Sequence, residues 1–140
     1  MAEPKSGVEA LQAAVIDGLR ASAPLTALVG ARIYDEVPAD SDRPQPPYVY
    51  VGGVSKARRE LSCGPGWNIR LRLYVVGLGF GRLALWEIVE IIAELVDETE
   101  PVLAGRWALL DRITVASAAD VVEPADPKSA AIELVTILSD

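Results

Sequence analysis

The chain has 140 residues, of which 51% are apolar and 24% charged, values that are typical of a globular protein rather than a disordered one. Its net charge of −7 argues against general affinity for DNA or acidic membranes, because both require clustered Lys and Arg. The chain contains no histidine and one cysteine, Cys63, so it lacks the commonest general base, the commonest zinc ligand and any internal disulfide. We therefore expect no catalytic site, no metal site and no cofactor.

The N-terminal third predicts two helices. Residues 6–9 (Ser-Gly-Val-Glu) have the spacing of a capping box. Apolar residues then recur at helical spacing: Val8, Leu11, Val15 and Leu19. We expect a helix from about Gly7 to Ala21 and, opened by Pro24, a second short helix over Leu25–Val29 that Gly30 closes.

A proline-rich stretch follows a brief predicted strand at Ile33 and Tyr34. Residues 38–47 contain four prolines among Asp and Ser, so this segment cannot pair into a sheet. Loops of this length in a compact domain are usually functional or disordered. In an assembly protein such a loop would be an arm that reaches a neighbour, with these candidate contact residues: Pro38, Arg43, Pro44 and Pro46.

The centre of the chain predicts an antiparallel hairpin followed by a long helix. A strand begins at Tyr48, is weakened at Gly52-Gly53, and turns at residues 63–66 into a second strand. That second strand alternates apolar and polar residues, with Ile69, Leu71, Leu73 and Val75 on one side. The hairpin covers about residues 48–77. Beyond it, apolar residues recur at helical spacing and acidic residues occupy the other side: Leu85, Ile88, Ile92 and Leu95 against Glu87, Glu90, Glu94 and Asp97.

The C-terminal third predicts a second hairpin. One strand runs over residues 107–115 with an interruption at Asp111, and the last strand runs over residues 129–138. The expected fold is α+β: an antiparallel sheet of about four strands, covered on one face by an N-terminal helix and one long central helix, in a single domain of residues 1–140. No secretory signal is expected at residues 1–5, and the apolar run of residues 83–96 is too short and too acidic to span a membrane.

A glycine-rich run, residues 77–81, lies between the second strand and the central helix. A dinucleotide-binding fingerprint would need a third glycine where Arg82 stands, so a flexible turn is the favoured interpretation. A small nucleotide-binding domain that uses this loop remains the alternative. A positive charge at a helix start opposes the macrodipole, which predicts a partner carboxylate or simple exposure for Arg82.

Two charged sets are candidates for contacts between copies of the chain. One set lies on the two paired strands: Arg58, Arg59, Arg70 and Arg72. It is either ordinary exposed strand charge or a basic stripe that meets an acidic surface of a neighbouring copy. The other set, on the central helix, is either a solvated face or a lumen or interface: Glu87, Glu90 and Glu94. Trp86, between the apolar and acidic sides, is a candidate for an interface edge.

Several short stretches along almost the whole chain together resemble a known family. They are Ala10–Val15 (ALQAAV), Leu25–Tyr34 (LTALVGARIY), Val37-Pro38, Pro47–Val49 (PYV), Arg70–Leu73 (RLRL) and Ile132–Val135 (IELV). The pattern resembles the small tail-completion or tail-terminator proteins of long-tailed phages, prophages and gene transfer agents.

The resemblance implies a structural virion protein without enzymatic activity, made in the bacterial host cytoplasm and placed at the tail–head junction, or neck. Copies of the subunit would form a hexameric ring that caps the tail tube, ends its growth and joins the tail to a head-completion or connector protein. DNA would pass through the lumen without specific binding, and an acidic lumen would keep it from adhering. The resemblance implies no membrane partner. Another neck or head–tail adaptor protein is the alternative.

Overall fold

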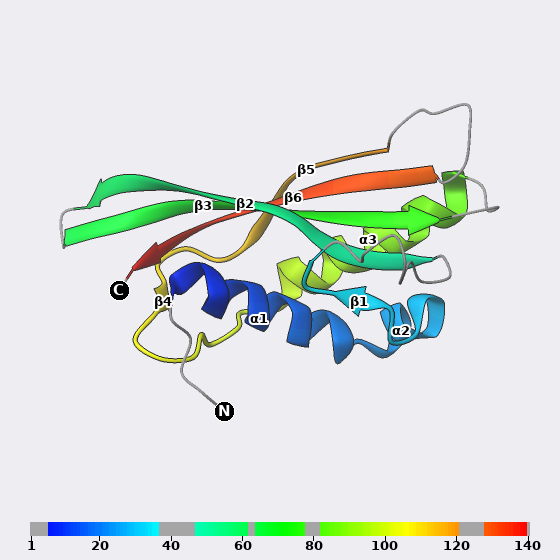
Figure 1. Ribbon diagram of the computed structural model, residues 1–140, viewed down its shortest axis with the longest axis horizontal. Coiled ribbons are helices and arrows are strands. Elements are labelled where there is room, and N and C mark those ends of the chain that lie inside the picture. Colours follow the sequence, from blue (N-terminus) through cyan, green and yellow to red (C-terminus); the bar gives the residue numbers. More distant parts are fainter. Residues whose placement is uncertain (1–5, 37–46, 62–63, 78–81, 121–127, 140) are drawn as a thin grey trace.

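The computed structural model describes residues 6–36, 47–61, 64–77, 82–120 and 128–139. Within these residues, three helices lie on one side of a curved sheet of six strands (Figure 1). The expected class, α+β with helices on one face of the sheet, is confirmed. The expected number of strands, about four, is too low.

The two N-terminal helices form as their sequence predicts. The first, α1 (Gly7–Arg20), begins at Ser6, whose Oγ accepts a hydrogen bond of 3.1 Å from the backbone N–H of Glu9. The second, α2 (Ala23–Val29), ends at Gly30, whose φ of +63° lies in the left-handed region that glycine adopts without strain. Caps and periodicity are local signals, which is why they place these helices correctly.

The sheet is antiparallel except at one edge. Its strands are β1 (Ile33–Tyr34), β2 (Tyr48–Leu61), β3 (Gly64–Gly77), β4 (Ala108–Leu109), β5 (Thr114–Asp120) and β6 (Lys128–Ser139). They lie in the order β1-β2-β3-β6, and both β4 and β5 pair with the outer side of β6. β1 pairs with β2 in parallel. The predicted hairpin over residues 48–77 is confirmed as β2 and β3. In the C-terminal third the last predicted strand is found as β6, but its main partner, β5, shares only residues 114–115 with the strand predicted over residues 107–115.

The strand expected over residues 107–115 is instead two short strands, β4 and β5, with a bend between them. The backbone bends at residues 110–111, where Oδ1 of Asp111 accepts a hydrogen bond of 3.0 Å from the backbone N–H of Arg112. The backbone oxygen of Asp111 accepts a hydrogen bond of 2.7 Å from Oγ1 of Thr136, which fixes the bend against β6. The interruption noted at Asp111 therefore divides the strand.

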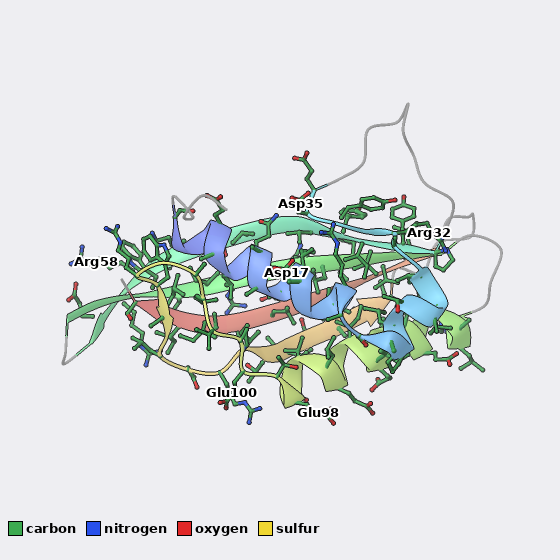
Figure 2. The ribbon with its side chains drawn as sticks, turned by 90° about the horizontal axis from the view of Figure 1, so that it is seen from below. Asp17, Arg32, Asp35, Arg58, Glu98 and Glu100 are labelled. Carbon is green, nitrogen blue, oxygen red and sulfur yellow. The ribbon has the colours of Figure 1, made fainter. Side chains whose placement is uncertain are left out.

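The hydrophobic core lies between the sheet and the helices. The alternating apolar residues of β3 all face the helices and are buried: Ile69, Leu71, Leu73 and Val75. α3 (Arg82–Glu98) places its predicted stripe against them, with Leu85, Ile88 and Ile92 buried. Figure 2, from the helix side, shows α1 crossing the sheet beside α3. Each buried leucine or isoleucine contributes about 1.5–3 kcal/mol relative to an exposed one, so this layer supplies most of the folding energy.

The hairpin of β2 and β3 extends beyond the rest of the sheet. Trp67 pairs with Leu138, one residue before the end of β6, whereas residues 59–61 and 64–66 pair only with each other. We call this tip the hairpin arm. Figure 1 shows it protruding past the helices, on the side where β6 ends. Such a projection adds no core, so it is available for contacts outside the chain.

Candidate interaction surfaces

The side of the sheet that faces away from the helices is uncovered in the described structure (Figure 1). We call it the open sheet face. Its side chains are exposed or half-buried: Tyr50, Ser55, Ala57, Arg59, Asn68, Arg70, Arg72, Tyr74, Ala131, Glu133, Val135 and Ile137. Along β3 and β6 these residues alternate with buried ones, as expected for a sheet with one covered face. The face combines aromatic, charged and small apolar side chains.

All four tyrosines of the chain lie in one row at the β1 end of this face. Tyr34 meets Tyr48 edge-on with ring centroids 6.3 Å apart, and Tyr48 stacks on Tyr50 at 6.1 Å. Tyr50 in turn stacks on Tyr74, its partner across the ladder, at 5.3 Å. Ring pairs at these spacings stabilise a sheet beyond their buried area. Together they make a continuous aromatic row, in which Tyr48 is buried.

A glycine makes room for the last ring of this row. A register shift between Val51 and Gly53 leaves Gly52 as the extra residue of a β-bulge. A Cβ atom built on Gly52 would lie 2.0 Å from a carbon of the Tyr74 ring, so the ring lies directly over the glycine backbone. The weakening predicted at Gly52-Gly53 is thus a bulge that positions Tyr74.

A charged triad lies at the centre of the open sheet face. Glu133 on β6 accepts hydrogen bonds from Arg70 and, at 3.4 Å, from Arg72. The hydrogen bond from Arg70, and to a smaller extent that from Arg72, holds the pKa of Glu133 below its ordinary value. Desolvation alone would raise this pKa. A hydrogen bond to Tyr74 and one to Glu133 raise the pKa of Arg72. The arginine side chains remain 64% and 51% exposed, so donors of both are available to a further carboxylate.

Three of the four arginines predicted as a basic stripe share this face. Arg70 and Arg72 alternate with the buried residues of β3, and the register of β2 against β3 puts Arg59 on the same face. The side chain of Arg59 makes no hydrogen bond or ion pair with the described residues. Arg58 lies on the other face, opposite Trp67 in the ladder, and forms an ion pair of 2.9 Å with Glu60. Figure 2 shows Arg58 at the hairpin end of the molecule. The structure therefore does not bring Arg58 together with the other three.

Trp86 connects α3 with the edge of the sheet. Its Nε1 donates a hydrogen bond of 3.0 Å to Oδ2 of Asp120, and the same oxygen lies 2.8 Å from Nε of Arg82. The partner carboxylate predicted for Arg82 is thus found. Trp86 is half-buried against the core, and its place at a subunit interface stays a prediction.

The three glutamates predicted as a lumen or interface lie together on α3. Glu87, Glu90 and Glu94 are exposed on the side opposite the buried stripe, and none forms an ion pair within the described part of the chain. Leu83 occupies the same helix side and is 87% exposed. Whether this surface faces a lumen or a neighbour stays a prediction.

Other predicted features fall outside the described residues. These are the docking-loop residues Pro38, Arg43, Pro44 and Pro46, together with Cys63 and residues 78–81 of the glycine run. The strand before that run, β3, pairs antiparallel with both of its neighbours, whereas a dinucleotide site needs a parallel βαβ unit. No group of metal-ligating side chains occurs among the described residues, and no helix there is long and apolar enough to cross a membrane.

Sequence reasoning missed the tyrosine row and Glu133. The signal for Glu133 was present: it is the one charged residue within the mostly apolar run of residues 130–138. A single acid there, beside a strand with two alternating arginines, predicts a cross-strand ion pair once the two strands are known to be neighbours.

Comparisons with known proteins show which family the chain matches. Residues 13–138 match the family model described as tail completion protein gp17. A chain from the virion of a native gene transfer agent particle has the same fold with a TM-score of 0.82 and 27% identity, over 98% of this chain and all of that one. The gp17 protein of bacteriophage SPP1 is similar in fold, with a TM-score of 0.60 and 24% identity over 91% of this chain and 87% of its own. No curated protein sequence matches the chain. The chain belongs to the tail completion protein gp17 family and is a structural protein of the tail of a phage or gene-transfer-agent virion.

Proposed function

We propose that this protein forms a ring that caps the finished tail tube, stops its growth and joins the tail to the head connector. The number of copies in the ring is six, as the family resemblance implies. One observation carries the proposal: the chain has the fold of a gene-transfer-agent virion chain over 98% of its length. Its partners are then other copies of itself, the tube protein and a head-completion or connector protein.

The surfaces of the molecule support a role in assembly. Interfaces are enriched in tyrosine, tryptophan and arginine, and the open sheet face presents the tyrosine row beside three arginines. The hairpin arm projects beyond the core, where it can reach a neighbour. The net charge of −7 suits a ring through which DNA moves without adhering.

Deletion of the gene in its source particle, followed by negative-stain imaging, tests the proposal. Tubes that are too long and lack heads are expected, and a plasmid copy of the gene should restore tails of normal length. Tails of normal length that have separated from heads would instead favour the head–tail adaptor role. Intact particles with normal tails would reject both roles.

A further inference from the structure

We propose that the open sheet face of one copy binds the acidic outer side of α3 of the next copy. This contact rests on the proposed ring and specifies which surfaces build it. The outer side of α3 is defined here by Leu83, Glu87, Glu90 and Glu94. Both surfaces belong to the same chain, so the partner is a second copy of this protein.

The open sheet face carries surplus positive charge in an acidic molecule. The face carries three arginines and one glutamate: Arg59, Arg70, Arg72 and Glu133. The whole chain, by contrast, has a net charge of −7. With Asp111 at the margin of the face, the positive surplus persists. The acidic charge of the chain therefore lies on other surfaces, which makes the molecule complementary to itself.

The acidic residues on the outer side of α3 destabilise the helix that carries them. Acidic residues recur three or four positions apart, where like charges repel: Glu87, Glu90, Glu94, Asp97 and Glu98. The last two lie at the C-terminus of the helix, where negative charge opposes the macrodipole. The helix has one basic residue, Arg82, which pairs with Asp120. An arginine-bearing surface laid along this side would relieve the repulsion.

The two surfaces also match in their apolar parts. Leu83 stands 87% exposed at the start of α3, in line with the three glutamates at positions i+4, i+7 and i+11. The open sheet face offers small and half-buried apolar side chains beside its arginines, among them Ala57, Val135 and Ile137. An exposed leucine followed by a row of acids thus fits apolar side chains that lie beside arginines.

The position of the two surfaces gives the contact a direction. The open sheet face lies on one side of the sheet and α3 on the other (Figure 1). A contact between two different surfaces is head-to-tail, and repetition of such a contact gives a closed ring or a helical filament. A symmetric pair of open sheet faces would instead place arginines against arginines.

Charge reversal in matched sets tests the contact in the deletion strain. The face variant, Arg59→Glu, Arg70→Glu, Arg72→Glu and Glu133→Arg, reverses the charge of the face and keeps opposite charges in the triad. The helix variant is Glu87→Lys, Glu90→Lys and Glu94→Lys. A control, Arg58→Glu with Glu60→Arg, reverses an ion pair on the other face of the same hairpin.

Neither the face variant nor the helix variant alone is expected to restore normal tail length, whereas the control should restore it. Expression of both variants together should also restore it, because each supplies the surface that the other now requires. The melting midpoint of the purified helix variant should stay equal to wild type or rise, since its repulsion is relieved. If the face variant does not fold, Arg59→Glu replaces it, because that side chain has no partner among the described residues.

Restoration of tail length by the helix variant alone would overturn the proposed contact. Failure of the two folded variants to complement each other would overturn it as well. Neither result bears on the ring itself, because the deletion phenotype and its rescue by the wild-type gene test that separately.

Discussion

Nε1 of Trp86 on α3 donates a hydrogen bond of 3.0 Å to Oδ2 of Asp120 at the end of β5. Nε of Arg82 lies 2.8 Å from the same oxygen. One carboxylate thus holds the first turns of the long helix against the edge of the sheet. It also offsets the positive charge of Arg82, which the helix macrodipole disfavours at this end.

Asp120→Ala is expected to lower the free energy of unfolding by about 1–2 kcal/mol, because it leaves the half-buried indole N–H of Trp86 without an acceptor. Urea unfolding followed by tryptophan fluorescence measures the change. Asp120→Asn is the matched control: it keeps an oxygen for Trp86 and removes only the attraction to Arg82. That guanidinium is 61% exposed, so we expect a smaller loss, about 0.2–1 kcal/mol. Equal losses in the two variants would contradict a dominant role for the indole hydrogen bond.

Gly52→Ala is expected to destabilise the protein by about 1–3 kcal/mol, the usual range for overpacking. A Cβ atom there would lie 2.0 Å from the Tyr74 ring, which must then leave its stack with Tyr50. Chemical denaturation gives the stability, and near-UV circular dichroism reports the tyrosine row. Gly53→Ala provides the comparison, because a Cβ atom built at Gly53 would have no other residue within 4 Å, and a change below about 0.5 kcal/mol is expected. Similar effects at both positions would show that the backbone of the bulge, and not the Tyr74 ring, requires glycine at position 52.

The elements with local signals could be predicted from the sequence. The cap at Ser6, the glycine at Gly30 and the two periodicities of residues 69–96 place three helices and the central hairpin within a few residues. Side-chain period alone also separates Arg58 from Arg59, since consecutive strand residues point to opposite faces. Their relation to Arg70 and Arg72 depends on the register of β2 and β3.

The remaining parts depend on contacts between distant residues. Ile33 pairs in parallel with Val49, 16 positions further along the chain, and no local pattern encodes that pairing. Glu133 meets arginines that lie 61 and 63 residues away. The tyrosine row needs both the β1–β2 pairing and the bulge at Gly52. Such features follow from the tertiary fold, which is why the sequence alone shows the residues without their arrangement.

The Glu133 triad predicts a pH dependence of stability with a definite sign. Because Arg70 and Arg72 lower the pKa of Glu133 in the folded state, the folded protein binds fewer protons than the unfolded chain below the ordinary carboxyl pKa of 4.5. The contribution of this carboxylate is therefore complete above that pH and is lost as the pH falls through the lowered pKa. Unfolding free energies of wild type and Glu133→Gln, measured at intervals from pH 7 to pH 2, should converge at the acid end. A difference that stays constant across this range would contradict the triad.

Leu83→Ser separates a contact between copies from a contribution to folding. With 87% of its surface exposed, Leu83 gives the monomer little, and we expect the free energy of unfolding to change by less than about 0.5 kcal/mol. Burial of a leucine in the proposed contact is worth about 1.5–3 kcal/mol, and the loss recurs at every contact of a ring. The variant should therefore melt like wild type and yet fail to restore tail length in the deletion strain. Val102→Ser is the control, because Val102 is 94% exposed but lies outside α3, and it should restore normal tails. Normal tails with Leu83→Ser would remove this residue from the contact between copies.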